Sequence, residues 1–573
     1  MKSAKRWNTT FATVVLSASL LAASLPVYAD APWSSAVSGT PGTVYALSNS
    51  IGAELKTIAV NKGADGTKIA AVIRLRNDGA ARSRVPDFEL RATSADGIEY
   101  ALTASSTNAR SLMGKESADL TYLVTVDRQD ELGLTGLKFV EVDEYVYPKL
   151  ETTMLTIPMT RVWNSAKSDF EQPAEPIAWG APFTVPGSDS PIVYTPVGYT
   201  EDNGSEARAY VVTLLAENKG GIGETVEEFR LDGKAADKTY AGQRIEKEPV
   251  TLAAGEKKYV RFSIPAESGT VLDSLLLMTN GTFAAAGQPA VTFEAGAQKI
   301  AVPSVRTEPV NTNESYATGT PIAFDPLNRL IAADTEVSLV ELHMHDNEGA
   351  GFKSVVAKFK LYNKGSSTSA LPAFGAEIVG TDGAAYAGSR QAQTPAVMMP
   401  NLSYVVSYSF MVPATENGER LAVRLLDSQS AAPYSSTIAS IRAEVGEEAE
   451  GSALSFYPFN LKIDYWTVNG MYNAATGYSY RMKLDLDVEQ VDNVVADAGF
   501  SKLKIELTDT LGRVIGSQSV PFTGTNKLIS GEQTISFSNI YTDNYQYPLV
   551  VKLYESIDTP NGEANRLVKT LKQ

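Results

Sequence analysis

The sequence contains no cysteine and only two histidines among its 573 residues. The absence of cysteine excludes a disulfide scaffold, thiolate zinc sites, iron–sulfur clusters and thiol catalysis. The scarcity of histidine leaves most histidine-based mechanisms without their central residue. Positive charge is also in short supply, because the formal net charge is -16. Nucleic acids and anionic membranes bind dense cationic faces, so we expect neither as a partner.

Long apolar runs are lacking except at the N-terminus. There a positively charged start is followed by the uncharged apolar stretch 11–25, and small residues surround Ala29. This arrangement is typical of a signal peptide that is cleaved after Ala29. An uncleaved membrane anchor is the alternative, but it needs about 20 apolar residues. We therefore expect an exported protein that loses residues 1–29 and has no membrane span in the mature chain.

Three copies of one pattern follow. Each copy has an alternating strand that ends in Asn-x-Gly, and the three asparagines are 141 and 145 residues apart. A phenylalanine, an aspartate and a tyrosine then follow at nearly constant spacing. The columns are Asn77, Asn218 and Asn363; Phe88, Phe229 and Phe374; Asp96, Asp237 and Asp382; and Tyr100, Tyr240 and Tyr386. A fixed period of this kind predicts a tandem array of equal domains.

A fourth, divergent copy completes the array. The segment from Met482 to Val488 alternates as the first strand of the other copies does, but Glu489-Gln490-Val491 stands where they have Asn-x-Gly. This copy is predicted to be a terminal cap or a specialised domain. The predicted domains after the signal peptide 1–29 are residues 39–165, 178–305, 318–448 and, for the divergent copy, 452–573.

Within each copy the apolar residues alternate with polar ones, which predicts strands with one buried face. Val260, Phe262 and Ile264, for example, share one face of a segment that ends at a proline. Short strands separated by turn residues, with almost no helical periodicity, predict an all-β fold of tandem antiparallel β-sandwiches.

The Asn-x-Gly sequences are interpreted as turns and not as ligands. Asparagine can hydrogen-bond its own loop, and glycine adopts positive φ without a steric penalty. We therefore expect positive φ at the glycine of such a turn, as at Gly220.

The order of these elements resembles the telokin-like, immunoglobulin-type domains found in secreted bacterial proteins. Residues 218–265 carry the resemblance best, through Asn218-Lys219-Gly220, Gly255-Glu256 and the segment from Phe262 to Pro265. This copy departs from the pattern in having Asp237-Lys238 where the others have Asp-Gly. The resemblance implies an extracellular immunoglobulin-like β-sandwich. Domains of this type are usually non-catalytic, so no catalytic residues are carried over.

The sequence has no Gly-x-Ser-x-Gly elbow, no phosphate-binding loop and no His-Glu-x-x-His. Glu341, His343 and His345 are the sharpest candidates for a site, because alternation puts them on one face of a strand while Leu342 and Met344 point to the other. A carboxylate and two imidazoles are ligands that zinc accepts. The alternative is a solvated outer strand face. No cofactor is expected.

Tyrosines gather in the divergent copy. Tyr541, Tyr545 and Tyr547 lie outside the shared columns and stand beside acids and amides. Tyrosine rings can stack on sugar rings while neighbouring polar groups bind hydroxyls, so these three residues are the predicted ligand-binding set. Packing within or between domains is the alternative interpretation.

Three classes of function remain. The first is a secreted, non-catalytic protein of the cell envelope or extracellular matrix that presents β-sandwich surfaces for adhesion or partner binding. The second is a dedicated extracellular protein that binds a glycan or a metal, and the third is an enzyme with an unrecognised site. Repeats, export and the missing catalytic motifs favour the first, with cell-wall polysaccharide or an extracellular protein as the partner.

Overall fold

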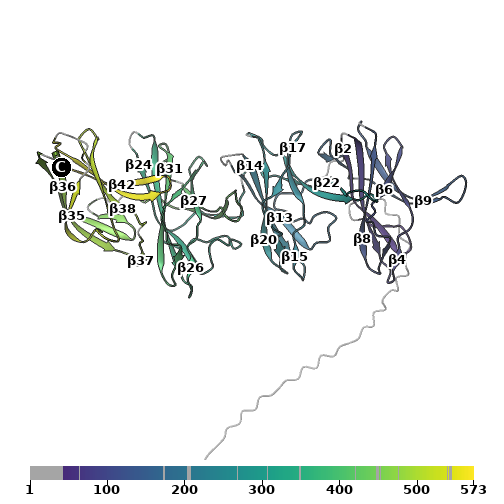
Figure 1. Ribbon diagram of the computed structural model, residues 1–573, viewed down its shortest axis with the longest axis horizontal. Helices are drawn as coiled ribbons and strands as arrows, with labels where there is room; N and C mark the ends of the chain where they lie inside the picture. Colours follow the sequence, from purple (N-terminus) through teal and green to yellow (C-terminus); the bar gives the residue numbers. More distant parts are fainter. Residues whose placement is uncertain are drawn as a thin grey trace, which may run out of the picture. The chain divides into compact units, whose positions relative to one another are not determined.

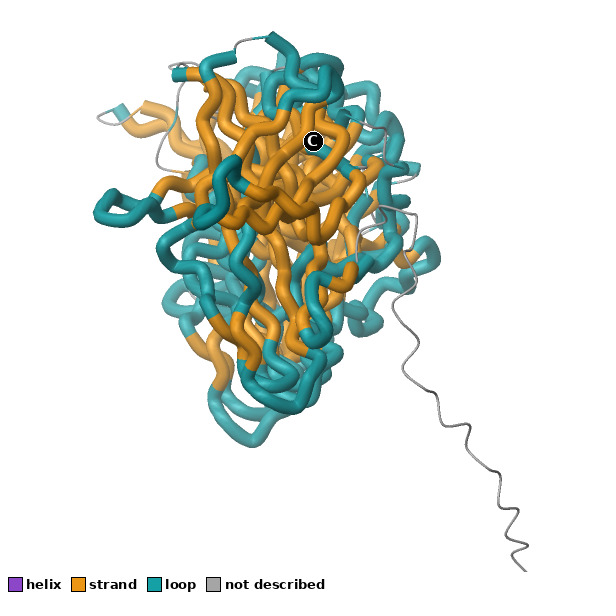
Figure 2. The backbone as a smooth tube through the Cα atoms, turned by 90° about the vertical axis from the view of Figure 1, so that its right-hand side faces the viewer, coloured by secondary structure: helices purple, strands orange, loops and turns teal. Residues whose placement is uncertain are grey.

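The structure is a computed structural model. It describes residues 43–573 except 64, 129, 160, 172–174, 203–207, 268, 306, 348–349, 420, 447–450, 452, 475–476, 498, 538–539 and 541–544. The described residues form strands and loops without a helix (Figure 2), which confirms the predicted all-β fold. Among them, accordingly, no helix is long and apolar enough to cross a membrane. The predicted signal peptide lies outside the described residues.

The chain divides into two compact units. Residues up to 162 together with 282–293 form the first, and residues 163–281 with 294–573 form the second. Four hydrophobic cores follow one another along the sequence. The strands that supply them take up successive colours in Figure 1. We call the four sets of strands sandwiches 1 to 4. The first unit contains sandwich 1 together with residues 282–293 of sandwich 2, and the second contains the rest of sandwich 2 and sandwiches 3 and 4. The predicted domain boundaries stay predictions.

Sandwich 1 is built from seven longer strands. They are β2 (Ile51–Gly63), β3 (Gly66–Asn77), β5 (Glu89–Ser94), β6 (Glu99–Ala104), β8 (Ser117–Val126), β9 (Leu134–Asp143) and β10 (Leu150–Pro158). β6 pairs with both β5 and β8, and so joins the layer β2-β3-β8 to the layer β5-β9-β10. Ile69 and Ala71 point into the core, whereas Ala70 packs with Phe283 and Phe293 on the opposite face. Apolar packing therefore covers β3 on both faces.

Sandwich 2 repeats this order in two four-stranded sheets. Its strands are β13 (Ile192–Asp202), β14 (Ala209–Asn218), β16 (Arg230–Ala235), β17 (Lys238–Tyr240), β18 (Gln243–Arg244), β20 (Lys257–Pro265), β21 (Ser274–Phe283) and β22 (Val291–Ala301). One sheet has the order β13-β14-β20-β18 and the other β17-β16-β21-β22. Val260, Phe262 and Ile264 of β20 are fully buried in the core, as their alternation predicts.

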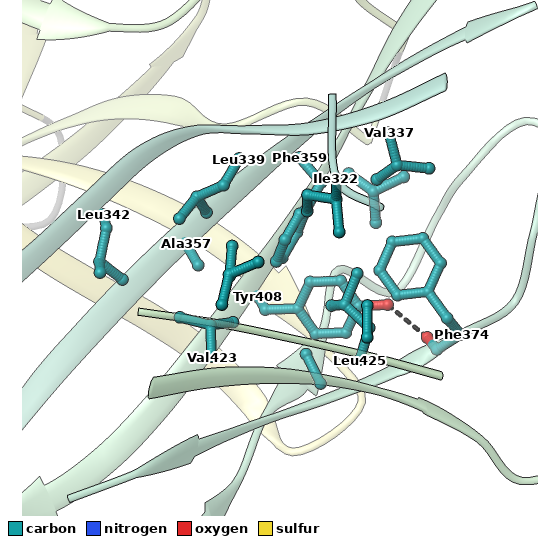
Figure 3. Close-up of a cluster of buried hydrophobic side chains, with 14 of the residues drawn as sticks. Ile322, Val337, Leu339, Leu342, Ala357, Phe359, Phe374, Tyr408, Val423 and Leu425 are labelled. Atoms are coloured by element: carbon teal, nitrogen blue, oxygen red, sulfur yellow. Dashed lines mark hydrogen bonds between the residues drawn. The ribbon is translucent and has the colours of Figure 1, made fainter. Parts of the chain in front are cut away.

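Sandwich 3 has the same arrangement. Its strands are β24 (Thr335–Asp346), β25 (Phe352–Asn363), β27 (Gly375–Val379), β28 (Ala385–Ala387), β29 (Ser389–Arg390), β31 (Ser403–Pro413), β32 (Ala422–Asp427) and β33 (Ser436–Arg442). Figure 3 shows its core, where the rings of Phe359, Phe374 and Tyr408 pack together and the Tyr408 hydroxyl donates to the Phe374 carbonyl. The column phenylalanine is thus a core residue.

Sandwich 4 keeps the two sheets but differs in its edges. Its strands are β34 (Ala453–Phe456), β35 (Phe459–Asn473), β36 (Gly477–Gln490), β38 (Lys502–Thr508), β39 (Val514–Pro521), β40 (Gly531–Phe537), β41 (Val550–Thr559) and β42 (Gly562–Lys572). Between β36 and β38 the short strand β37 (Val494–Val495) pairs in parallel with β31 of sandwich 3, with Val494 opposite Ser403. The fourth copy therefore uses the segment after its first hairpin to attach to its neighbour.

The asparagines of the Asn-x-Gly turns are buried and fully engaged. Asn218 Nδ2 lies 2.7 to 3.1 Å from three backbone carbonyls, those of Ile222, Leu252 and Ala253. Its Oδ1 accepts from the Gly220 N–H at 2.8 Å. Asn77 and Asn363 make the corresponding bonds in their own sandwiches. The prediction that these side chains bind their own loops is confirmed.

The expected backbone conformation of the turn glycine is wrong. Gly220 does not have φ in the left-handed region, unlike the Asp-Gly glycines Gly97 and Gly383 with φ of 83° and 81°. A Cβ at Gly220 would lie 2.7 Å from Pro191 Cγ and 3.0 Å from Asn218 Oδ1. Glycine is needed here because there is no space for a side chain beside the bonded asparagine.

Candidate functional site

The predicted site residues Glu341, His343 and His345 lie on strand β24. Leu342 belongs to the core of sandwich 3 and Met344 packs against it, so Glu341 and His343 face outward. The outward face is not solvated, however, because Glu341 and His343 are both buried. The strands β41 and β42 of sandwich 4 supply the buried groups opposite. The alternative interpretation as a solvated strand face is therefore wrong.

Four buried ionic side chains meet where sandwiches 3 and 4 join, and we call them the junction ion cluster. They are Glu341, Lys358, Glu555 and Arg566. Lys358 Nζ lies 2.9 Å from Glu341 Oε2 and 2.6 Å from Glu555 Oε1, and Arg566 Nη2 lies 2.8 Å from Glu555 Oε2. Lys358 and Glu341 stand opposite each other on β25 and β24, while Glu555 and Arg566 come from β41 and β42.

Polar groups around the cluster supply further hydrogen bonds. The Glu341 carboxylate accepts from the Ser455 hydroxyl and, at 3.1 Å, from the Tyr457 N–H. The Glu555 carboxylate accepts from the Ser501 hydroxyl at 2.6 Å. A buried ion pair needs such additional bonds to offset the loss of hydration. The cluster therefore holds two sandwiches together without leaving an uncompensated charge.

Burial and charge act on these carboxylates in opposite directions. Burial by itself raises the pKa of Glu341, but the positive charges of Lys358 and Arg566 outweigh it and lower the pKa to about 2. The pKa of Glu555 is likewise lowered by Lys358 and Arg566 against the effect of burial. Both carboxylates are therefore ionised at neutral pH.

The predicted metal ligands Glu341, His343 and His345 all lie on β24. In the part of the chain that the structure describes, no three His, Cys, Asp or Glu side chains form a group suited to a metal ion. The Glu341 carboxylate is engaged by Lys358, and the distance from His343 Nε2 to Glu341 Oε1 is 3.9 Å. Metal binding by these three residues stays a prediction.

The structure brings one of the predicted tyrosines, Tyr545, into a larger group, and Tyr547 lies two positions further along the same segment. Tyr541 lies outside the described residues. Tyr545 packs against Tyr478, with ring centroids 5.8 Å apart, and Tyr478 packs against Tyr472 at 5.0 Å. Tyr472 and Tyr547 are each 68% exposed, and Tyr545 is exposed too. We call Tyr472, Tyr478, Tyr545 and Tyr547 the tyrosine surface.

Strands β35 and β36 form the surface on which the Tyr545 ring packs. Gly470 lies beneath the ring, and a Cβ there would collide with it. Tyr480, directly opposite Gly470 in the hairpin, is buried and stacks on Tyr545 at 6.2 Å. The Tyr480 hydroxyl accepts from the Gln546 N–H at 2.8 Å and so fixes the segment that carries the ring. The surface is therefore held by the sheet.

Tyr472, Tyr478 and Tyr480 were not predicted from the sequence. Their signal was the hairpin itself: pairing across the turn between β35 and β36 puts Tyr472 opposite Tyr478 and Gly470 opposite Tyr480. A cross-strand aromatic pair flanked by a glycine is typical of a surface where another ring lies close to the backbone. The contact with Tyr545, more than sixty positions later in the chain, had no local signal.

Comparisons with known proteins give little. No known protein family matches the sequence, and no curated protein matches it. Among solved structures, dimeric latent PorU from Porphyromonas gingivalis matches at 9% identity with a TM-score of 0.14. The match covers 64% of this chain and 31% of the PorU chain, so this chain spans less than a third of the length of that protein. A TM-score this low supports no inference about fold or function.

Proposed function

We propose that this chain is a secreted, non-catalytic protein of the cell envelope or extracellular matrix. In this proposal its tandem sandwiches, of the telokin-like immunoglobulin type, present binding surfaces for adhesion or for a partner. The predicted export signal, the repeated asparagine turns and the buried junction between sandwiches 3 and 4 support it. The low positive charge favours a partner that is neither nucleic acid nor an anionic membrane.

The tyrosine surface is the observation that carries this proposal. Tyr472, Tyr545 and Tyr547 belong to none of the hydrophobic cores described, yet the sheet positions Tyr545 through Gly470 and Tyr480, and Tyr472 lies on β35 itself. Exposed aromatic rings held by a rigid sheet are typical of binding surfaces, because their apolar area is available and their conformational freedom is already reduced. Tyr472 and Tyr547 are largely exposed, so packing in a core does not explain them, and in this proposal they contact the partner.

A second candidate function is a dedicated glycan-binding protein. Tilted rings at 5.0 and 5.8 Å give a surface on which the apolar faces of sugar rings can stack. Neutral cell-wall polysaccharide is the partner that this geometry favours within the general proposal.

The test is binding of the mature full-length chain to insoluble cell-wall polysaccharide, measured as the sedimented fraction. Replacing Tyr472 and Tyr547 by Ala is expected to weaken binding by at least about tenfold. Both side chains are largely exposed, so we expect an unchanged melting temperature. The matched control replaces Tyr145 and Tyr147, which are fully exposed in sandwich 1, and should bind as the parent does.

Two results would contradict the glycan assignment. Binding that survives the double substitution at Tyr472 and Tyr547 would place the contact elsewhere, and equal loss in the control would show that exposed rings act without specificity. Capture of an extracellular protein that depends on Tyr472, with no polysaccharide bound, would support the general role and exclude the glycan candidate. Turnover of any substrate by the purified chain would overturn the non-catalytic proposal.

A further inference from the structure

In sandwiches 1, 2 and 3, the sheet that begins with the first long hairpin has a covered outer face. One residue on this face stands seven positions before the turn asparagine in each copy, and it is Ala70, Val211 or Val356. All three side chains are buried, although none belongs to the core of its own sandwich. Something outside each sandwich therefore covers this face.

The outer face of sandwich 1 is covered by the hairpin of strands β21 and β22. Phe283 of β21 and Phe293 of β22 pack on Ala70 of β3. The Ser106 N–H also donates to the Ala284 carbonyl at 2.7 Å. All of these residues belong to the first compact unit. Aromatic side chains from a hairpin thus bury an outer sheet face.

The corresponding hairpins of sandwiches 3 and 4 take the same position. The β41–β42 hairpin of sandwich 4 supplies Glu555 and Arg566 to the junction ion cluster, where they meet Lys358 on the outer face of β25. In sandwich 3, Thr437 of the β32–β33 hairpin lines a cavity of about 660 Å³ together with Thr213 on the outer face of β14. The chain therefore repeats one arrangement three times. The last hairpin of a sandwich faces the outer sheet face of the sandwich before it.

Sandwich 1 has the same hairpin, formed by β9 and β10, but no other sandwich precedes it in the described chain. The hairpin projects from sandwich 1 (Figure 1). Tyr145 and Tyr147 at its turn are fully exposed, and Val146 and Leu150 are exposed beside them. End units of a repeat array normally carry polar outer surfaces. Exposed apolar side chains in the first unit therefore indicate a further contact.

Sandwich 4 has the matching sheet, and its outer face is open. We call this the free sheet face. Its members are outward-pointing side chains of the β35–β36 hairpin, namely Tyr465, Met471, Arg481, Lys483, Asp485 and Asp487. Those of β36 are all exposed, and Tyr465 and Met471 of β35 are 59% and 48% exposed. The position that is covered in the other three sandwiches is thus uncovered here.

The charges of the two surfaces are complementary. The end of the β9–β10 hairpin carries the exposed acids Glu141 and Asp143, and its Glu144 already pairs with Lys149 at 2.9 Å. On the free sheet face, Arg481 stands between the uncharged Asn469 and Ser536 of the neighbouring strands. Acids around a pair of aromatic rings can therefore meet a cation beside an aromatic and a methionine side chain.

We propose that copies of this chain associate head to tail, with the β9–β10 hairpin of one copy packed on the free sheet face of the next. Tyr145 and Tyr147 pack on Tyr465 and Met471, as the phenylalanines of the β21–β22 hairpin pack on β3. The two patches differ, so the interface is heterologous and builds rings or filaments, not two-fold dimers. Tyr472 points to the other face of the sheet. The association is therefore independent of polysaccharide binding, which is measured at chain concentrations below those at which copies associate.

The first experiment is sedimentation velocity of the mature full-length chain from about 1 µM to about 100 µM. The weight-average mass is expected to rise at least about twofold over this range. The hairpin variant carries Tyr145→Ala and Tyr147→Ala, and the face variant carries Met471→Ala and Arg481→Glu. Each variant is expected to stay a single chain throughout, with an unchanged melting temperature because the replaced side chains are exposed.

The control for this experiment replaces Tyr472 and Tyr547 by Ala, and it should associate as the parent does. A loss of association in that control would place the contact on the tyrosine surface and overturn the assignment. A parent chain that stays single at the highest concentration would overturn the proposal itself.

The second experiment mixes the two variants in equal amounts. The hairpin variant keeps an intact free sheet face and the face variant keeps an intact hairpin, so the mixture is expected to form a complex of one copy of each. An interface made by one patch with itself gives a different result, because one of the two variants would then still associate alone. Association of either variant alone, or no complex in the mixture, would overturn the head-to-tail assignment.

Discussion

Sandwiches 2 and 4 end the same strand in opposite ways. In sandwich 2, β14 ends at Asn218, whose buried side chain closes the turn within its own domain. In sandwich 4, β36 ends at Gln490 without such an asparagine, and the chain continues to β37, which pairs with β31 of sandwich 3. Gln490 instead donates from Nε2 to the carbonyls of Asp492 and Val494, each at 3.0 Å. The side chain at the strand end thus closes a turn in sandwich 2, whereas in sandwich 4 it holds the segment that attaches to a neighbour.

A similar contrast holds for side chains on the outer strand faces of sandwiches 2 and 3. Thr213 lies five positions before Asn218, as Lys358 lies five positions before Asn363, so the two residues match. Thr213 is uncharged and stands between Gly198 and Arg261 on the neighbouring strands. Lys358, in contrast, binds Glu341 and Glu555 and is covered by sandwich 4. Lys358 can therefore be buried on an outer face because sandwich 4 covers it and supplies a second carboxylate, that of Glu555.

The largest expected effect comes from removing the central cation of the junction. Lys358→Met leaves Glu341 and Glu555 buried without their common partner, and loss of one member of a buried ionic group costs roughly 3–5 kcal/mol. We expect the unfolding transition that involves sandwiches 3 and 4 to move to lower urea concentration. Hydrogen exchange followed by mass spectrometry can assign that transition to β25 and β41.

Lys360→Met is the matched control for Lys358→Met. Lys360 lies two positions along the same strand and pairs with Asp492 at 2.5 Å, but both side chains remain partly exposed. Such a pair contributes at most about 1 kcal/mol. Equal destabilisation by the two substitutions would show that burial of Lys358 in the junction does not determine its contribution to stability. That result would contradict the distinction drawn between sandwiches 2 and 3.

The next largest effect is expected from acid, which should weaken the junction. The pKa of Glu341 in the folded protein is about 2, lower than its ordinary value of 4.5, because Lys358 and Arg566 outweigh burial. The resulting stabilisation is present above pH 4.5 and is lost as the pH falls towards 2, with a total on the order of 3 kcal/mol. Urea unfolding of sandwiches 3 and 4 across this pH range measures it. Glu341→Gln should flatten the dependence, and an unchanged slope in that variant would contradict the assignment.

Local patterns predicted much of the fold, and the reasons are physical. Alternation at Val260, Phe262 and Ile264 identifies a buried strand face because the side-chain period of a strand is two. The Asn-x-Gly turn is also local, since its first bonds join Asn218 to residues within four positions. These features need no knowledge of distant parts of the chain.

The junction could not be predicted in this way. Glu341 and His343 alternate with apolar residues, which is also the pattern of a wet outer face, and Glu555 follows Lys358 by almost two hundred positions. Only the packing of one domain on another decides whether such a face is buried. For the tyrosine surface, Tyr545 and Tyr547 were predicted, whereas Tyr472 required the register of the β35–β36 hairpin.

A smaller effect is expected from the asparagine that closes each separate turn. Asn218→Ala leaves the carbonyls of Leu252 and Ala253 buried without their donor, which we expect to destabilise sandwich 2 by about 2 kcal/mol. Thermal unfolding with hydrogen exchange across β14 measures the change. Glu489→Ala, at an exposed position beside the end of β36 in sandwich 4, should have no effect. A comparable loss in that control would show that the effect is not specific to the buried asparagine.

The smallest expected effect distinguishes two reasons for glycine at the turn. One is the lack of space for a side chain, and the other is a backbone conformation that favours glycine. Neither Gly220 nor Gly221 has φ in the left-handed region, but only Gly220 is crowded, with its added Cβ 2.7 Å from Pro191 Cγ. At Gly221 nothing lies within 4 Å of that position. Gly220→Ala should therefore destabilise sandwich 2 by about 1 kcal/mol through this overlap. Gly221→Ala should be neutral or stabilise slightly, because alanine reduces the freedom of the unfolded chain. Urea unfolding of both variants gives the comparison, and a loss at Gly221 equal to that at Gly220 would show that the turn requires glycine for its backbone and not for its space.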